Sequence, residues 1–412
     1  MNQAKIVILG GGMVAGYAAK QFVELGLPHG ELAILSADNA VPYERPPLSK
    51  GFLAGKDSED AIKINPDDFY KKQGIELRLN CEVDSVDLKR KRLVLKGGDE
   101  FGFEKLIVAT GARPRTLNIP GSTLRNLFYL RSMSDSRTIR SAAEKAKHAL
   151  VIGGGFIGME VAAVLAQEGI GVTMVLNDDR VFKRLFSPEM SSFFETYYAA
   201  KGVRLIKSTS VTEFRGDEAV RSAVLRDGQS IECDLVVAGI GVTPAMEVVK
   251  NSGLDLDNGI LVNEYLQSSH LDVFAAGDVA NYQDVLFGKR RRVEHWDNAV
   301  SQGQYCAKSL MGDKAPFRHV PYFFSDVFDL SYEYWGDSSG AEQVVHRGDL
   351  LSKSFSVWWV RQQRLVAAFA MNRPDEERNG APKWIESGQK LSVSKLRDVS
   401  QPIESASVAD AA

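Results

Sequence analysis

The sequence predicts an α/β fold with two Rossmann-like domains, because one pattern occurs twice along its 412 residues. Each copy begins with a short apolar run typical of a buried parallel strand, at residues 6–9 and 149–152. A glycine-rich turn and an apolar helical run follow at once, which is the order of a strand, a phosphate loop and a helix. The small residues of the two turns are Gly10, Gly12 and Ala15 in the first copy and Gly153, Gly155 and Gly158 in the second.

The residue types in these turns suit the binding of a dinucleotide. The first glycine turns the chain sharply, the second lets backbone amides approach a pyrophosphate, and the third small residue lets helix and strand pack closely. The start of the helix adds amide donors and a partial positive charge. One such turn alone is also compatible with an ordinary loop, but two copies in one chain predict two bound dinucleotides.

Composition places the chain among ordinary multidomain globular proteins, with 44% hydrophobic and 25% charged residues. A formal charge of -3 gives no overall field that would attract nucleic acid or anionic lipid. The apolar run at residues 6–9 is too short for a signal peptide, and no run reaches the roughly 18 apolar residues of a membrane span. A cytoplasmic protein without nucleic-acid or membrane partners is therefore expected.

Cysteine spacing excludes a redox disulfide and a zinc site. Cys81, Cys233 and Cys306 lie far apart and form no CxxC pair, so isolated reduced thiols are expected and no metal ligands are assigned.

Further short motifs lie where strands of an α/β sheet end. Arg113 follows the apolar strand at residues 105–109, and Gly241 lies in a Gly/Pro turn after the strand that ends near Ala238. Asp278 follows another buried strand, where its carboxylate can accept a hydrogen bond from a ribose or ribityl hydroxyl. The motifs at Arg113 and Asp278 extend the dinucleotide interpretation beyond the glycine turns, whereas the turn at Gly241 is what a crossing between two domains would need.

With these motifs in this order, the sequence resembles the two-dinucleotide-binding flavoproteins related to glutathione reductase, over residues 4 to about 390. The segments at 41–50 (VPYERPPLSK) and 293–296 (VEHW) resemble the branch that holds ferredoxin reductases, apoptosis-inducing factor and monodehydroascorbate reductase. Segments at 185–186, 197–202, 291–295 and 328–331 are most similar to monodehydroascorbate reductase. The resemblance implies an FAD-dependent NAD(P)H oxidoreductase.

The family architecture implies two Rossmann-like FAD- and NAD(P)H-binding domains of the glutathione reductase type and a smaller α+β C-terminal domain. Residues 1–112 and 245–315 would form the discontinuous FAD domain, 113–244 the NAD(P)H domain, and 316–390 the C-terminal domain. Residues 391–412 are rich in Ser, Ala and Asp with few large apolar side chains, so a mobile tail is expected there.

The resemblance also implies roles for individual residues. Lys50 would lie near flavin N5 and pair with Glu160, where a cation favours the reduced flavin, although each side chain taken alone is compatible with a solvated surface charge. His295 is read as a hydrogen-bonded packing residue in preference to a proton donor. The expected FAD-binding residues are Gly10, Gly12, Ala15, Asp38, Arg45, Pro47, Lys50, Arg113, Asp278, Glu294, His295 and Trp296, and those for NAD(P)H are Gly153, Gly155, Gly158, Glu160, Asp178 and Gly241.

The expected electron donor is NADH. Asp178 and Asp179 follow the strand at 172–176, and a carboxylate there accepts from the ribose 2′-hydroxyl and repels a 2′-phosphate. Arg180 and Lys183 follow directly and keep NADPH possible, because either cation can pair with that phosphate.

The expected acceptor differs from that of monodehydroascorbate reductase. That family has an arginine and a tyrosine, both associated with the ascorbyl radical, where this chain has Val300 and Phe324. A small anion would lose a charge partner and a hydrogen-bond donor. Residues 322–324, with Trp296 nearby, would form an aromatic wall, and Ser325-Asp326 matches the ferredoxin reductases. A ferredoxin-type carrier is therefore expected first and monodehydroascorbate second.

Three alternatives stay open at this level. A role from another class is NADH sensing, as in relatives of apoptosis-inducing factor. The basic run at residues 289–292 is either a docking surface for an acidic ferredoxin or a solvated loop. The oligomeric state is a monomer or a homodimer. Trp358 and Trp359 are predicted to lie in a strand of the C-terminal core.

Overall fold

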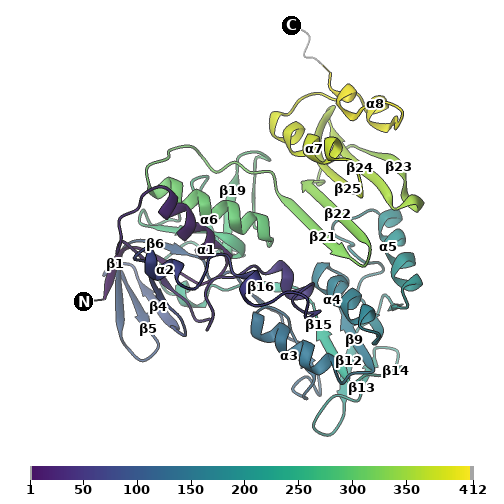
Figure 1. The fold of residues 1–412 in the computed structure, drawn as a ribbon, viewed down its shortest axis with the longest axis horizontal. Helices are drawn as coiled ribbons and strands as arrows, with labels where there is room; N and C mark the ends of the chain where they lie inside the picture. The colour runs from purple at the N-terminus through teal and green to yellow at the C-terminus, as the bar shows by residue number, and fades with distance from the viewer. Residues whose placement is uncertain (1, 409–412) are drawn as a thin grey trace. The chain divides into compact units, whose positions relative to one another are not determined.

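The computed structural model describes residues 2–408, which fold into two compact units (Figure 1). The first unit contains the chain up to Arg45 together with Glu59–Arg113 and Val242–Pro321. The second contains Pro46–Ser58, Pro114–Gly241 and the chain from Tyr322 onward.

The first unit is built on a mainly parallel sheet with the strand order β3-β2-β1-β6-β5-β4, and β18 pairs with β6. Helices α1 and α6 lie side by side (Figure 1), closely enough that a Cβ on Gly303 would lie 2.7 Å from the Val14 carbonyl oxygen. The strands and helices are β1 (Gln3–Leu9), α1 (Met13–Glu24), β2 (Leu32–Leu35), α2 (Phe69–Lys72), β3 (Glu76–Arg78), β4 (Val83–Asp87), β5 (Arg92–Leu95), β6 (Glu100–Val108), β17 (Ile260–Val262), β18 (Val273–Ala275), β19 (Ala280–Asp284), β20 (Lys289–Arg291) and α6 (Trp296–Leu310).

The Rossmann part of the second unit has the parallel strand order β11-β10-β9-β15-β8. Its central strands are apolar and buried on both faces, as expected for parallel strands covered by helices. Its elements are β8 (Leu127–Phe128), α3 (Met133–Ala143), β9 (His148–Ile152), α4 (Phe156–Gln167), β10 (Gly171–Val175), α5 (Pro188–Ala200), β11 (Arg204–Ile206), β12 (Val211–Arg215), β13 (Ser222–Leu225), β14 (Ser230–Glu232) and β15 (Leu235–Ala238). The chain passes between the units at β7 (Ala112–Pro114) and β16 (Val242–Pro244).

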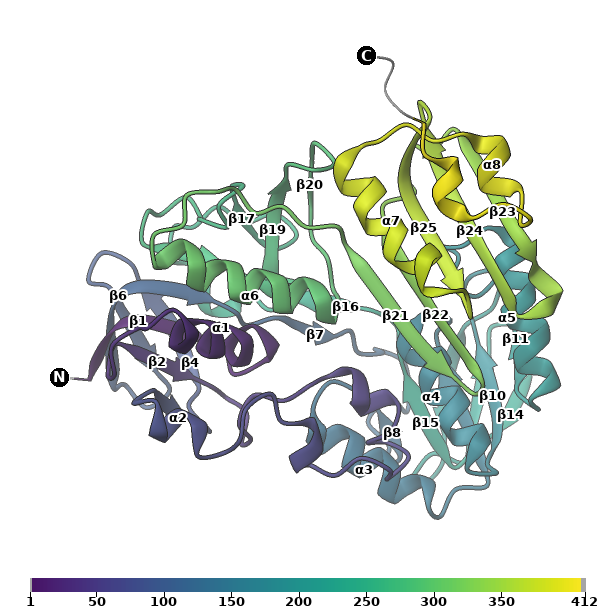
Figure 2. The same cartoon turned by 45° about the horizontal axis from the view of Figure 1, so that its top comes forward.

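The C-terminal part of the second unit is an antiparallel sheet with the order β21-β22-β25-β24-β23, and α7 packs across β25 and β22 (Figure 2). Trp358 and Trp359 are buried in β24, which confirms their predicted place in the core. Aromatic rings join this sheet to α5, since Phe194 contacts Tyr332 with centroids 5.1 Å apart. The elements are β21 (Tyr322–Val327), β22 (Leu330–Gly336), β23 (Gln343–Asp349), β24 (Ser354–Arg361), β25 (Arg364–Met371), α7 (Asp375–Ser387) and α8 (Val393–Arg397).

Residues 46–58 belong to the second unit, whereas the family architecture implied the FAD domain for them. Two contacts explain this grouping. The buried Ser136 hydroxyl of α3 donates to the carbonyl of Leu48 at 2.8 Å, and the Arg140 guanidinium lies 5.6 Å from the centre of the Phe52 ring. The segment that carries Pro47 and Lys50 is therefore fixed against the Rossmann part of the second unit.

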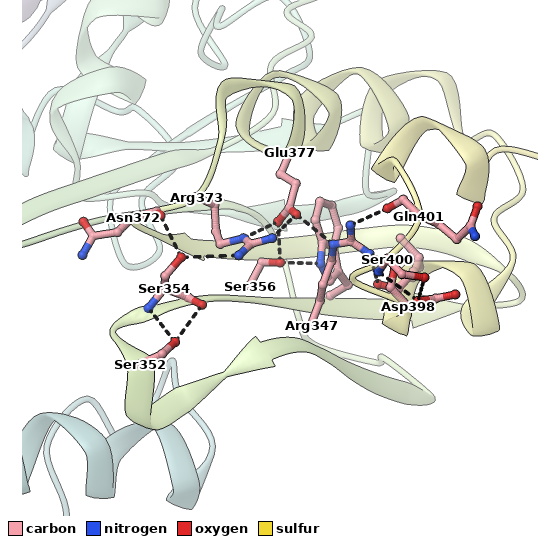
Figure 3. Close-up of polar contacts among 12 residues, drawn as sticks. Arg347, Ser352, Ser354, Ser356, Asn372, Arg373, Glu377, Asp398, Ser400 and Gln401 are labelled. Atoms are coloured by element: carbon pink, nitrogen blue, oxygen red, sulfur yellow. Dashed lines mark hydrogen bonds and ion pairs between the residues drawn. The ribbon is translucent and has the colours of Figure 1, made fainter.

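The expectation of a mobile tail from residue 391 is wrong for residues 391–408, while 409–412 lie outside the described residues. Helix α8 buries Leu396, and the 3₁₀ turn Ile403–Ala406 buries both of its end residues. The buried Arg347 of β23 donates to the carbonyls of Leu396, Asp398 and Gln401 (Figure 3). Composition alone misses this arrangement, because a partner elsewhere in the chain satisfies the polar backbone of the tail.

Within residues 2–408, no helix combines the length and the apolar character that crossing a bilayer requires.

Candidate dinucleotide and redox site

The first glycine turn leaves no room for side chains beneath it. Gly10 has φ +119°, and a Cβ there would lie 2.3 Å from the carbonyl oxygen of Ala109. Helix α1 begins after Gly12, which has no side chain to accept a hydrogen bond from the first amides of the helix. The Arg45 guanidinium lies 3.7 Å from the position of a Gly12 Cβ. Close backbone packing, helix amides and a nearby cation suit a pyrophosphate.

The strand end near Asp278 offers a second feature that fits a bound dinucleotide. Gly277, at φ +79°, donates its amide to the Gln302 side-chain oxygen at 2.7 Å. The buried Gln302 amide nitrogen has no partner within the described residues, so it is an orphan donor beside this turn. The residues of the first unit therefore fit an FAD, for which Gly10, Gly12 and the start of α1 would hold the phosphates and the turn at Gly277 would offer polar groups to the rest of the molecule.

Several other residues expected at the FAD are already engaged inside the first unit. The Asp38 carboxylate accepts from the amides of Asn39 and Ala40 and from the Tyr43 hydroxyl. Arg113 is largely exposed and lies 3.5 Å from Glu247. The binding roles of Asp38 and Arg113 stay predictions.

The segment before α6 is held by its own contacts. His295 is the N-cap residue of α6 and its Nδ1 accepts from the Asp297 amide at 3.4 Å, which is a helix-capping role in line with the packing interpretation. The Trp296 indole donates to Glu44, and Arg292 pairs with Glu294 at 2.5 Å.

The basic run at residues 289–292 is structural, so its interpretation as a solvated loop is wrong, while docking of a carrier stays a prediction. Its residues include strand β20, and Arg290 donates to the carbonyls of Val262 and Asn281. Arg291 pairs with the buried Asp284, and Arg292 donates to the Asp278 carbonyl at 3.0 Å. The three arginines of the run therefore hold this part of the first unit together.

The second glycine turn repeats the first in the second unit. A Cβ on Gly153, which has φ +113°, would lie 2.2 Å from the Gly239 carbonyl oxygen, and a Cβ on Gly158 would lie 2.2 Å from that of Gly153. Gly155 is the N-cap of α4 and has open space around its Cβ position. Gly241, at φ +95°, follows β15, which runs parallel to β9. This edge fits the second dinucleotide.

Asp178 and Asp179 follow β10 and lie beside Arg180 and Lys183, the two cations that could pair with a 2′-phosphate. Lys183 is 3.1 Å from Asp179 and 3.9 Å from Asp178, and Arg180 is 3.5 Å from Asp179. The hydrogen bond from Lys183 lowers the pKa of Asp179 below its usual value. Both carboxylates are more than half exposed, so they are accessible to a ribose.

Lys50 and Glu160 form an ion pair within the second unit. Their Nζ and Oε1 atoms are 3.5 Å apart, and the exposed fractions of the side chains are 16% and 7%. The Lys50 ammonium also lies 4.7 Å from the centre of the Phe324 ring and 3.9 Å from Asp326. The expectation that these charges meet, and are not solvated separately, is confirmed.

Comparison with known proteins identifies the family. The model of the pyridine nucleotide-disulphide oxidoreductases matches residues 4–303, and a reductase C-terminal model matches residues 322–407. The chain belongs to the pyridine nucleotide-disulphide oxidoreductase family. It is an FAD-dependent NAD(P)H oxidoreductase with the two Rossmann-type domains and the C-terminal domain expected from the sequence.

The proteins similar to this chain include monodehydroascorbate reductases and ferredoxin reductases. Monodehydroascorbate reductase 4, peroxisomal, of Arabidopsis thaliana is 40% identical over 90% of this chain and 80% of that protein, and the Pisum sativum enzyme is 35% identical over 92% and 93%. Among solved structures, the ferredoxin reductase for the CYP199A2 system of Rhodopseudomonas palustris has a TM-score of 0.94 at 32% identity, covering 99% and 100% of the two chains. A covalent putidaredoxin reductase-putidaredoxin complex gives 0.93 at 31%, with 98% of each chain covered.

In this oxidoreductase the aromatic residues of β21 do not form one wall. Side chains alternate along a strand, so the Phe323 ring stacks on Phe156 with centroids 6.1 Å apart, whereas Tyr322 and Phe324 stack on each other at 5.8 Å. The expectation of a continuous wall at residues 322–324 is wrong. Phe324 instead lies beside Lys50.

Two functional candidates escaped the sequence-based assignment, namely Ser49 and Ser325. Both hydroxyls donate to the Glu160 carboxylate. The sequence does place Ser49 in the segment PPLSK and Ser325 in the segment Ser-Asp, both of which resemble the family. Neither segment indicates by itself that the serine contacts Glu160.

The three cysteines are free. Burial raises the pKa of the Cys233 and Cys306 thiols to about 12, so neither is poised as a thiolate.

Proposed function

We propose that this oxidoreductase passes electrons from NADH through FAD to a ferredoxin-type one-electron carrier protein. When bound, FAD supplies the chemistry, because it accepts electrons in pairs from NADH and releases them singly. The protein's own residues bind and orient the two dinucleotides, and Lys50, held by Glu160, supplies a cation that favours the reduced flavin. The observation that carries the choice of acceptor is that two positions of the sequence hold the apolar residues Val300 and Phe324.

The apolar residues at these two positions argue against a small anionic substrate. Monodehydroascorbate reductases have an arginine and a tyrosine at these positions, and a site built around such groups discriminates strongly for them. The Phe324 ring is engaged with Tyr322 and with the Lys50 ammonium. The solved complex of putidaredoxin reductase with putidaredoxin supports a protein carrier, since this chain matches it over 98% of its length.

Monodehydroascorbate is the second candidate acceptor, favoured by the 40% identity to the Arabidopsis reductase. We expect NADH-dependent reduction of cytochrome c through a plant-type or bacterial 2Fe–2S ferredoxin to have a kcat/KM at least about tenfold above that for the ascorbyl radical. The radical is generated with ascorbate oxidase. Efficient turnover of the radical together with failure of every ferredoxin would overturn the proposal.

A matched pair of substitutions sharpens the choice of acceptor. Val300→Arg combined with Phe324→Tyr restores the charge and the hydroxyl of the monodehydroascorbate reductases. Turnover of the ascorbyl radical should rise about tenfold in this double variant while ferredoxin reduction does not improve. An unchanged ratio of the two activities would mean that these positions do not select the acceptor.

The nicotinamide donor is expected to be NADH, by about tenfold in kcat/KM over NADPH. Asp178 and Asp179 can accept from a ribose 2′-hydroxyl and repel a 2′-phosphate. In Asp178→Ala/Asp179→Ala, Arg180 and Lys183 lose their carboxylate partners, so the preference should shift toward NADPH by about tenfold. The exposed Asp217→Ala is the control. A wild-type preference for NADPH would contradict the assignment.

Location in the cytoplasm stays a prediction, because the relatives include proteins named peroxisomal. The choice between monomer and homodimer also stays open.

A further inference from the structure

Glu160 is a buried carboxylate in the interior of α4, where an unpaired charge would be strongly unfavourable. Three groups compensate it. The Ser49 hydroxyl donates to Oε2, the Ser325 hydroxyl donates to Oε1 at 2.5 Å, and the Lys50 ammonium lies 3.5 Å from Oε1. Each oxygen of the carboxylate therefore has its own hydroxyl donor.

The serines make the tighter contacts with Glu160. A separation of 3.5 Å lies beyond the usual length of an N–H to O hydrogen bond, so Lys50 interacts with Glu160 mainly through charge. Charge attraction depends weakly on orientation, whereas two hydroxyl donors on separate oxygens fix the plane of the carboxylate. The orientation of Glu160 is thus set by the serines and not by the lysine.

Both serines are themselves held rigidly. Ser49 ends the 3₁₀ turn Pro46–Ser49, which the buried Ser136 anchors through the Leu48 carbonyl. Ser325 lies on β21 opposite Tyr332 of β22, inside the antiparallel sheet. The exposed fractions of Ser49 and Ser325 are 1% and 0%, so solvent has little access to replace their hydroxyls.

Strand β21 also contacts the lysine of the pair. The residues on either side of Ser325 are Phe324 and Asp326, which lie 4.7 Å (ring centre) and 3.9 Å from the Lys50 ammonium. A single strand of the C-terminal sheet therefore touches both members of the pair, Glu160 through a hydroxyl and Lys50 through a ring and a carboxylate.

We propose that Ser49 and Ser325 are positioning residues, which keep the Glu160 carboxylate at its distance from the Lys50 ammonium and thereby hold that ammonium in place. The inference rests on the proposed function, in which the Lys50–Glu160 pair assists reduction of the flavin. It makes the C-terminal sheet part of the donor side of the enzyme, because β21 carries Ser325.

The first test measures flavin reduction by NADH in rapid-mixing experiments. Ser325→Ala and Ser49→Ala should each slow the reduction about tenfold, as expected for loss of a hydrogen bond to a charged group. Ser325→Thr, which keeps the hydroxyl, should restore most of the rate. The exposed Ser331→Ala on β22 is the matched control and should react like the wild type.

A double-mutant cycle separates positioning from general damage. If Ser325 acts through Glu160, Ser325→Ala should have little further effect in a Glu160→Ala background. Fully additive slowing would overturn the inference, because it would mean that Ser325 acts independently of Glu160.

The second test does not depend on turnover. Competitive acetylation of Lys50, followed by mass spectrometry of its peptide, should be severalfold faster in Ser325→Ala than in the wild type, because a loosened carboxylate releases the ammonium. Unchanged acetylation in both serine variants would overturn the inference. Faster acetylation with unchanged flavin reduction would support the positioning role and overturn the role of the pair in the proposed function.

Discussion

Replacing Glu160 or Lys50 by alanine is expected to slow reduction of the flavin by NADH about a hundredfold, the size typical for loss of an oriented charge at a reacting centre. FAD retention should change much less, because neither residue belongs to the first glycine turn. The two side chains form one ion pair, so the double variant should be little slower than either single variant.

Matched controls for this experiment lie on the same elements. Glu168, at the end of α4, and Lys56, in the segment 46–58, are exposed, and their alanine variants should reduce FAD at the wild-type rate. Rapid mixing of each oxidised variant with NADH gives the rate constants directly. Wild-type rates in both the Glu160 and the Lys50 variants would remove the pair from the redox site.

The glycine turns could be predicted from the sequence because their requirement is local. A Cβ at Gly10 or Gly153 would lie 2.3 or 2.2 Å from a backbone carbonyl oxygen. Only glycine fits at these positions, so its presence in the sequence indicates the tight turn. The strand and helix on either side carry their own apolar pattern. The dinucleotide chemistry could therefore be inferred before any contact was known.

The serine ligands of Glu160 could not be predicted in this way. Ser49 and Ser325 lie 111 and 165 positions from Glu160 along the chain. Serine is common and carries no periodic signal, so only the folded arrangement shows that both hydroxyls converge on one carboxylate.

Two of the wrong expectations share a physical cause. The basic run at 289–292 and the segment 391–408 were judged by their own composition, which is polar in both cases. In the structure, carbonyls and carboxylates of other segments satisfy the arginines of the run, and Arg347 satisfies the carbonyls of the segment. A polar segment is ordered when distant partners complete its hydrogen bonds.

The partners of Arg347 form a buried network in the C-terminal sheet (Figure 3). Its guanidinium donates to Glu377 at 2.8 Å, and Glu377 also accepts from Arg373 and from the Ser356 hydroxyl. Burial alone would raise the pKa of Glu377, but hydrogen bonds from Arg373, Arg347 and Ser356 outweigh burial and lower it. Arg347 thus links a charged carboxylate on α7 to three carbonyls of the C-terminal segment.

Arg347→Ala is expected to release that segment. Removing one member of a buried ion pair costs about 3–5 kcal/mol, and the lower end applies here because Arg373 still pairs with Glu377. A change of about 3 kcal/mol raises the open population roughly a hundredfold. Trypsin cleavage after the exposed Lys395 and Arg397 should accelerate accordingly, since proteolysis follows the open population when reclosing is fast.

Two further variants serve as controls. In Arg361→Ala, which changes an exposed residue of β24, trypsin should cleave after Lys395 and Arg397 at the wild-type rate. The cleavage rate of Arg347→Lys should fall between those of the wild type and Arg347→Ala, because a lysine keeps the charge but cannot reach all three carbonyls. Equal cleavage rates for Arg347→Ala and the wild type would mean that buried apolar residues such as Leu396 and Ile403 hold the segment without the arginine.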